Sequence, residues 1–306
     1  MTGRARNLMT LASAAIVIIS LWYLYGTAAH YGGLLPDAAL IKGQGLVLVG
    51  LGLLYLLGLL VLAEVWYLIL HGLSANQAAQ RPQAYASFLS SQIGKYLPTG
   101  IFHLVGRFSW LVRYGHDKVV VAKATLLELG IMATVSLFVG LAGFICFPPE
   151  SGFIEMLTAL TGIDSMPLSL SIAVVAAIVV AGWLVFRRYF WQEVKQVSPL
   201  VLAEAALFFL LQVAAFAGCY YLTSGSLPFS LLPIFTVSWF VGFAVVGAPG
   251  GIGVREAAFV LLSAGIAAPE FALGSIVLFR LVTLAAEITA FVIGYIINDR
   301  YKNQVA

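Results

Sequence analysis

Long apolar runs separated by short polar segments dominate the sequence. Six of these runs come close to, or exceed, the about 20 apolar residues with which an α-helix crosses the hydrocarbon core of a bilayer. They cover residues 8–25, 45–70, 124–147, 169–186, 200–223 and 273–297. The pattern predicts an all-α polytopic membrane protein with six full spans, built as a single transmembrane domain over residues 1–306.

Two further apolar runs are interrupted. Residues 86–107 contain Lys95 and Pro98, flanked by Gly94 and Gly100. Residues 228–268 break at the sequence GAPGGIG over 247–253, with a helix expected to restart near Val254. The order span, span, broken segment, span therefore occurs twice, over 8–147 and over 169–297. Interrupted segments at matched positions of two oppositely oriented halves are typical of transporters, so we predict an inverted repeat with two re-entrant segments. Two full crossings within 228–268 are the alternative.

The composition supports a lipid environment. Charged residues make up 9% of the chain and apolar residues 61%, against about 25% and about 45–50% in soluble domains. These values, with a mean hydropathy of +1.00, exclude a soluble globular enzyme. The net charge of only +3 gives no basis for nucleic-acid binding. No Cys/His spacing suggests a metal site, and no cofactor is expected.

The distribution of Lys and Arg predicts the orientation, because cytoplasmic loops carry an excess of both. With both termini in the cytoplasm, thirteen of the sixteen basic residues lie on the inner side. The first run, 8–25, exceeds the about 7–15 residues of a signal-peptide core, so we interpret it as an uncleaved first span. The thirteen basic residues are Arg4, Arg6, Arg81, Lys95, Arg107, Arg113, Lys118, Lys123, Arg187, Arg188, Lys195, Arg300 and Lys302.

The second broken segment carries a candidate anion site. Gly250, Gly251 and Gly253 allow positive φ and a close approach of the backbone, and a helix starting near Val254 would direct its first N–H groups into the break. Arg255 adds a permanent charge with a geometry suited to phosphate or carboxylate. Glu256 would either hold Arg255 or cap the helix. The alternative is a structural glycine-rich turn with an internal Arg–Glu pair.

The first broken segment carries Lys95, followed by His103 and Arg107. A charge at the bilayer centre costs at least about 2.5–3.5 kcal/mol, so such residues must face protein, water or a ligand. Lys95 and Arg107 could therefore bind a phosphate. The alternative for Lys95 is snorkelling to the cytoplasmic headgroups.

Four more charged residues occupy the predicted spans. Arg280 and Glu287 are seven residues apart on one helical face, about 10 Å along the axis, and either line a site or form a buried ion pair. Glu128 and Glu204 lie near the cytoplasmic ends of their spans. Together with Glu287 they are candidates for ion pairing or for proton coupling.

Two motifs give the chain a family resemblance. GKYLP at 94–98, with Gly106-Arg107 downstream, and PGGIGVRE at 249–256 resemble the lysylphosphatidylglycerol synthase transmembrane-domain family over roughly residues 45–297. Thr99 and Phe102 depart from the pattern, where Gly and Trp are expected. The resemblance implies a stand-alone member, without the soluble aminoacyltransferase domain, in a bacterial-type inner membrane.

The resemblance also implies lipid translocation, with membrane lipids, above all anionic ones, as the partners. We therefore expect a flippase that moves a phosphate-bearing lipid (a phospholipid, a glycolipid or a polyprenyl-phosphate-linked lipid) through a cationic cavity near the midplane. Two alternatives stay open: a membrane enzyme acting on a lipid phosphate or a lipid-linked sugar, and a non-transporting partner of an envelope glycosyltransferase. A homo-oligomer, or a complex with an envelope-biosynthesis enzyme, is left open as well.

Overall fold

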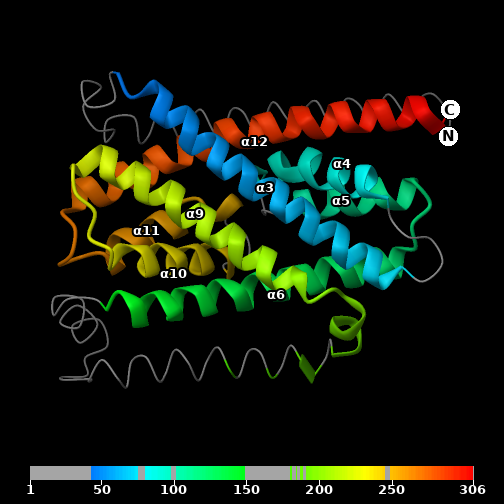
Figure 1. Cartoon of the computed structure of the whole chain (residues 1–306), viewed down its shortest axis with the longest axis horizontal. Coiled ribbons are helices and arrows are strands. Elements are labelled where there is room, and N and C mark those ends of the chain that lie inside the picture. Colours follow the sequence, from blue (N-terminus) through cyan, green and yellow to red (C-terminus); the bar gives the residue numbers. More distant parts are fainter. Residues whose placement is uncertain are drawn as a thin grey trace.

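The computed structural model describes residues 43–74, 80–97, 101–148, 191–244 and 249–305, and the isolated positions 180, 184, 187 and 188. Within these ranges the chain is helical and forms no strand. The predicted span 8–25 and nearly all of 169–186 lie outside the described residues. The elements (Figure 1) are α3 (Gly45–Leu73), α4 (Arg81–Ser91), η2 (Gln92–Tyr96), α5 (Phe102–Arg113), α6 (Lys118–Cys146), α9 (Leu200–Ser224), α10 (Leu231–Ala244), η3 (Pro249–Gly251), α11 (Val254–Leu262) and α12 (Pro269–Val305).

Four of the described helices are long and apolar enough to cross a membrane: α3, α6, α9 and α12. They coincide with the predicted spans 45–70, 124–147, 200–223 and 273–297, so the prediction of an all-α membrane protein is confirmed. Helix α12 has 37 residues and is therefore about 55 Å long, which exceeds the about 30 Å of hydrocarbon. Its last turns, which include Arg300, therefore extend beyond the apolar layer if the helix is not strongly tilted.

Local sequence sets the ends of these helices. Asp117 precedes α6, and its side chain accepts a hydrogen bond from the backbone N–H of Val119 at 2.6 Å. This bond satisfies one of the donors that a helix N-terminus leaves free. Helix α9 begins at Leu200, after Pro199, and ends at Ser224. The next residue, Gly225, has a φ of 70°, which suits the left-handed cap of a helix C-terminus.

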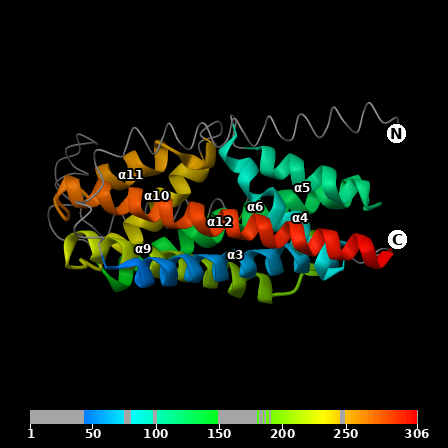
Figure 2. The ribbon, with the colours of Figure 1, turned by 90° about the horizontal axis from the view of Figure 1, so that it is seen from above.

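Both predicted interruptions are present. The first broken segment consists of α4, η2 and α5, and the second of α10, η3 and α11. Their helices have 11, 12, 14 and 9 residues, so none is long enough to cross the bilayer alone. Helices α4 and α5 lie at the end of the molecule where α12 finishes, whereas α10 and α11 lie at the opposite end (Figures 1 and 2).

The broken segments pack against the long helices and meet one another between them. Helix α4 packs along α12, α10 packs along α6, and α3 packs along α9. The short turns η2 and η3 are in contact, with Gly250 directly against the ring of Tyr96. The two interruptions of the sequence therefore come together in the interior of the bundle.

An aromatic cluster holds the second broken segment in place. Phe216 of α9 stacks on Phe235 of α10, with ring centroids 4.2 Å apart and an interplanar angle of 9°. Phe259 of α11 and Phe279 of α12 meet Phe216 edge to face, at 4.9 and 6.0 Å. All four rings are buried, so this cluster joins both halves of the broken segment to two spans.

Candidate functional site

An internal cavity of about 440 Å³ lies where the two broken segments meet. Both segments and three of the long helices (α3, α6 and α12) contribute to its lining. Its charged lining residues are Lys95, Arg107, Glu128, Arg255, Arg280 and Glu287, and its other polar or aromatic lining residues include Tyr55, Phe88, Gln92, His103, Trp239 and Thr283. The sequence marks eight charged residues over nearly two hundred positions, and the fold places six of them around one space, without Glu204 and Glu256.

The second broken segment forms a tight turn followed by a helix start. Gly250, Gly251 and Gly253 have φ values of 58°, 70° and 81°. The backbone N–H of Gly253 donates to Glu256 Oε2 at 2.6 Å, so Glu256 caps α11, which begins at Val254 as predicted. The start of this helix lies tightly against α10, because a Cβ on Gly242 would come within 2.9 Å of Arg255 Cβ.

Arg280 holds the same turn from α12. Its Nε donates to Glu256 Oε1 at 2.5 Å, and a terminal guanidinium nitrogen donates to the carbonyl oxygen of Gly250 at 3.0 Å. Glu256 therefore caps the helix and pairs with Arg280. The alternatives in which Glu256 holds Arg255, or in which Arg280 pairs with Glu287, are both wrong. Seven residues along a helix separate Arg280 and Glu287 by about 10 Å, which allows each to reach a different partner.

Lys95, in the first broken segment, reaches across to α12. Its Nζ donates to Glu287 Oε1 at 2.5 Å, and the hydroxyl of Tyr55 on α3 donates to the same oxygen at 2.9 Å. The Glu287 side chain is only 1% exposed and that of Lys95 19%. Lys95 thus points into the bundle and does not snorkel to the headgroups. Pro98 lies outside the described residues.

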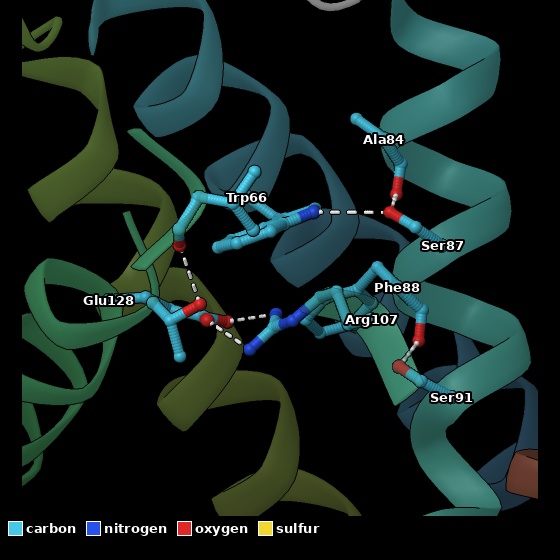
Figure 3. Close-up of polar contacts among 9 residues, drawn as sticks. Trp66, Ala84, Ser87, Phe88, Ser91, Arg107 and Glu128 are labelled. Atoms are coloured by element: carbon cyan, nitrogen blue, oxygen red, sulfur yellow. Dashed lines mark hydrogen bonds and ion pairs between the residues drawn. The ribbon is translucent and has the colours of Figure 1, made fainter. Parts of the chain in front are cut away.

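Arg107 occupies a closed aromatic pocket (Figure 3). It forms two contacts with Glu128 of α6, at 3.0 and 2.6 Å, in the parallel geometry that favours guanidinium–carboxylate pairs. The guanidinium carbon lies 3.9 Å from the ring centroid of Trp66 and 5.2 Å from that of Phe88. Arg107 is only 2% exposed, so it is paired, stacked and enclosed.

Arg255 has a different environment. It lies in the first turn of α11, partly exposed to the cavity, with its guanidinium carbon 5.5 Å from the ring centroid of Trp239. Its Nε is buried without a hydrogen-bond partner. Of the carboxylates in the described ranges, none lies within ion-pair distance of Arg255.

Two predicted residues remain, His103 and Glu204. His103 lines the cavity and packs close to the turn at Gly94, where an added Cβ would lie 2.8 Å from the His103 backbone nitrogen. Glu204, on α9, does not line the cavity. Its predicted role in pairing or coupling therefore has no support from the geometry of this site.

Sequence reasoning missed the aromatic part of the site. Tyr55 binds Glu287, Trp66 covers Arg107, and Trp239 lies beside Arg255. The available signal was weak: each is an aromatic residue with a polar group inside a long apolar run. Such residues also occur as ordinary core residues of a membrane bundle.

Comparisons of this chain with family models, with curated proteins and with solved structures find no match. The resemblance to the lysylphosphatidylglycerol synthase transmembrane-domain family therefore stays an expectation from the two motifs.

Proposed function

We propose that the protein is a lipid flippase, which moves the headgroup of a phosphate-bearing lipid across a bacterial-type inner membrane. The observation that carries this proposal is the partly open, basic cavity between two broken membrane segments. Its volume of about 440 Å³ falls in the about 300–1,000 Å³ range of small-molecule sites. The polar headgroup would occupy the cavity while the acyl chains stay in lipid.

An inverted repeat is the finer architecture that we propose. Its first half would contain α3, the first broken segment and α6, and its second half α9, the second broken segment and α12. The packing of the helices is consistent with this repeat. Helix α4 of the first half packs along α12 of the second half, and the corresponding helix α10 of the second half packs along α6 of the first half. The broken segments would then be re-entrant from opposite sides, with six spans and both termini in the cytoplasm. Opposed motion of such halves would open the cavity to each leaflet in turn.

Each proposed half also contains one ion pair at the corresponding position, but the positions of the arginine and the glutamate are exchanged between the halves. Arg107 on α5 pairs with Glu128 on α6, and Glu256 on α11 pairs with Arg280 on α12. Each pair joins the second helix of a broken segment to the span that follows it. Such pairs would close the two ends of the cavity and would have to loosen in alternation during transport.

The arrangement of carboxylates favours transport over catalysis. A membrane enzyme acting on a lipid phosphate needs a positioned nucleophile or base. Glu128, Glu256 and Glu287, the described carboxylates in or beside the cavity, are each bound to a basic residue at 2.6 Å or less. A carboxylate whose oxygens already bind a lysine or an arginine is not free to take a proton from a substrate or to attack it. We therefore rank the enzyme hypothesis second.

A proteoliposome assay tests the proposal. Purified protein is reconstituted with trace fluorescent lipids, and a membrane-impermeant quencher reports the fraction that has crossed. Wild-type protein is expected to flip a phosphate-bearing lipid, and Arg255→Gln to reduce the rate at least tenfold with an unchanged melting temperature. Lys123→Gln is the matched control, since Lys123 forms a surface pair with Glu193 and is not among the residues that line the cavity. No protein-dependent flipping of any lipid by folded wild type would overturn the proposal.

A further inference from the structure

The charges in and beside the cavity do not balance. The lysine and arginine residues are Lys95, Arg107, Arg255 and Arg280, and the described acidic residues are Glu128, Glu256 and Glu287. Three ion pairs account for all of them except Arg255. The Lys95–Glu287 pair is neutral whichever residue holds the proton, and both arginine pairs are neutral because arginine stays protonated in proteins. The described residues therefore leave one positive charge, on Arg255.

The start of α11 adds little further positive potential. A helix N-terminus carries roughly half a positive charge, but the carboxylate of Glu256 already binds the N–H of Gly253 at that end. Among the described residues, Arg255 is thus the one Lys or Arg at the cavity that has no ion-pair partner. Its buried Nε lacks a hydrogen-bond acceptor, which an anionic ligand would provide.

We infer that the cavity selects a headgroup with one net negative charge, namely a phosphodiester whose second alcohol is polar and uncharged. This inference rests on the proposed function and names its substrate class. A phosphate diester carries one negative charge and would neutralise Arg255. A second charge, as on a phosphate monoester, would lack a cation in a poorly solvated site, where an unpaired charge is costly.

The same count disfavours zwitterionic headgroups. A quaternary ammonium or an amine needs an anion or an exposed aromatic face for its positive charge. The three carboxylates that the described residues place at the cavity are bound by Lys95, Arg107 and Arg280. Trp239 lies beside Arg255, so the ring already faces one cation. A neutral polar alcohol needs neither a free carboxylate nor a free aromatic face.

Competition binding tests the charge rule separately from transport. Detergent-solubilised protein at pH 8 is offered equimolar phosphatidylglycerol, phosphatidylcholine and phosphatidate with identical acyl chains, and bound lipids are counted by native mass spectrometry. Wild type is expected to bind the singly charged diester at least tenfold more than either competitor. Equal binding of the three lipids, or a preference for phosphatidate, would overturn the inference without any variant.

Variants then assign the selectivity to Arg255. Arg255→Gln is expected to reduce the preference for phosphatidylglycerol over phosphatidylcholine to less than twofold, and Arg255→Lys, which keeps the charge, to retain most of it. Lys123→Gln removes the same charge from the surface and is expected to leave the preference unchanged. A Lys123→Gln effect as large as that of Arg255→Gln would contradict the assignment. Selective binding without flipping would overturn only the proposed function, and flipping without charge selectivity only this inference.

Discussion

Each of the two broken segments places one arginine at the same cavity, and the two arginines have opposite environments. Arg107 of the first segment is 2% exposed, bound to Glu128 and stacked on Trp66. Arg255 of the second segment faces the cavity without a carboxylate partner within the described chain. A compensated cation inside a membrane protein maintains packing, whereas an uncompensated one is costly unless a ligand meets it. From this comparison we expect Arg107 to stabilise the fold and Arg255 to bind the ligand.

The largest expected effect is on the first arginine. Arg107→Met leaves Glu128 charged and buried without its partner, which typically costs about 3–5 kcal/mol. Arg255→Gln breaks no ion pair and removes a cation that has no described carboxylate partner, so no loss of stability is expected. Thermal unfolding of both variants in the same detergent measures the difference. A larger loss of stability in Arg255→Gln than in Arg107→Met would reverse the comparison.

The second expected effect concerns the Glu256–Arg280 pair, which supports the turn beside Arg255. Arg280→Gln strands the Glu256 carboxylate and is expected to cost about 3 kcal/mol. The double variant Glu256→Gln/Arg280→Gln removes both charges and is expected to be more stable than Arg280→Gln alone. A double-mutant cycle by thermal unfolding measures this coupling. Additive losses would mean that the 2.5 Å contact is energetically unimportant.

A third and smaller effect is expected from alanine substitutions at two glycines with positive φ. Comparing the two variants separates the cost of backbone strain from that of a steric clash at the centre of the site. Alanine at a left-handed position costs roughly 1–2 kcal/mol. Gly250 has a φ of 58°, and an added Cβ would lie 3.2 Å from the Tyr96 ring, so Gly250→Ala is expected to lose both stability and flipping. Gly225→Ala is the matched control, because Gly225 has a φ of 70° with nothing within 4 Å. Equal flipping rates in both variants would show that contact between the broken segments is not needed.

The smallest effect is a pH dependence at the end of the first broken segment. His116, in the loop before α6, is 9% exposed and lies 3.2 Å from Gln83 Oε1 of α4. Burial lowers its pKa below the ordinary 6.5. The unfolded chain therefore binds the proton more readily, so this contribution to stability is present above pH 6.5 and is lost as the pH falls below it.

Melting temperatures at pH 8 and pH 5.5 measure this dependence. A small decrease at the lower pH is expected for wild type, and a smaller one for His116→Gln. An equal decrease in both proteins would assign the dependence to other groups.

The sequence alone determined the elements and their chemistry. Apolar runs of at least about 20 residues predict spans, and α3, α6, α9 and α12 match four of the predicted runs. Glycines at positions with positive φ produce the break before Val254. The same reasoning marked Lys95, Arg107, Arg255 and Arg280 as residues that need a partner, because charge is costly in lipid.

Only the tertiary structure decided which partner each charged residue has. Lys95 binds Glu287, 192 residues away, because η2 packs against α12. Arg280 binds Glu256 and not Glu287. Periodicity along one helix gives a shared face, but the contact also depends on which neighbouring helix supplies the opposite charge. Because these pairings use the carboxylates at the cavity, Arg255 has no carboxylate partner in the described chain. No local pattern in the sequence predicts this.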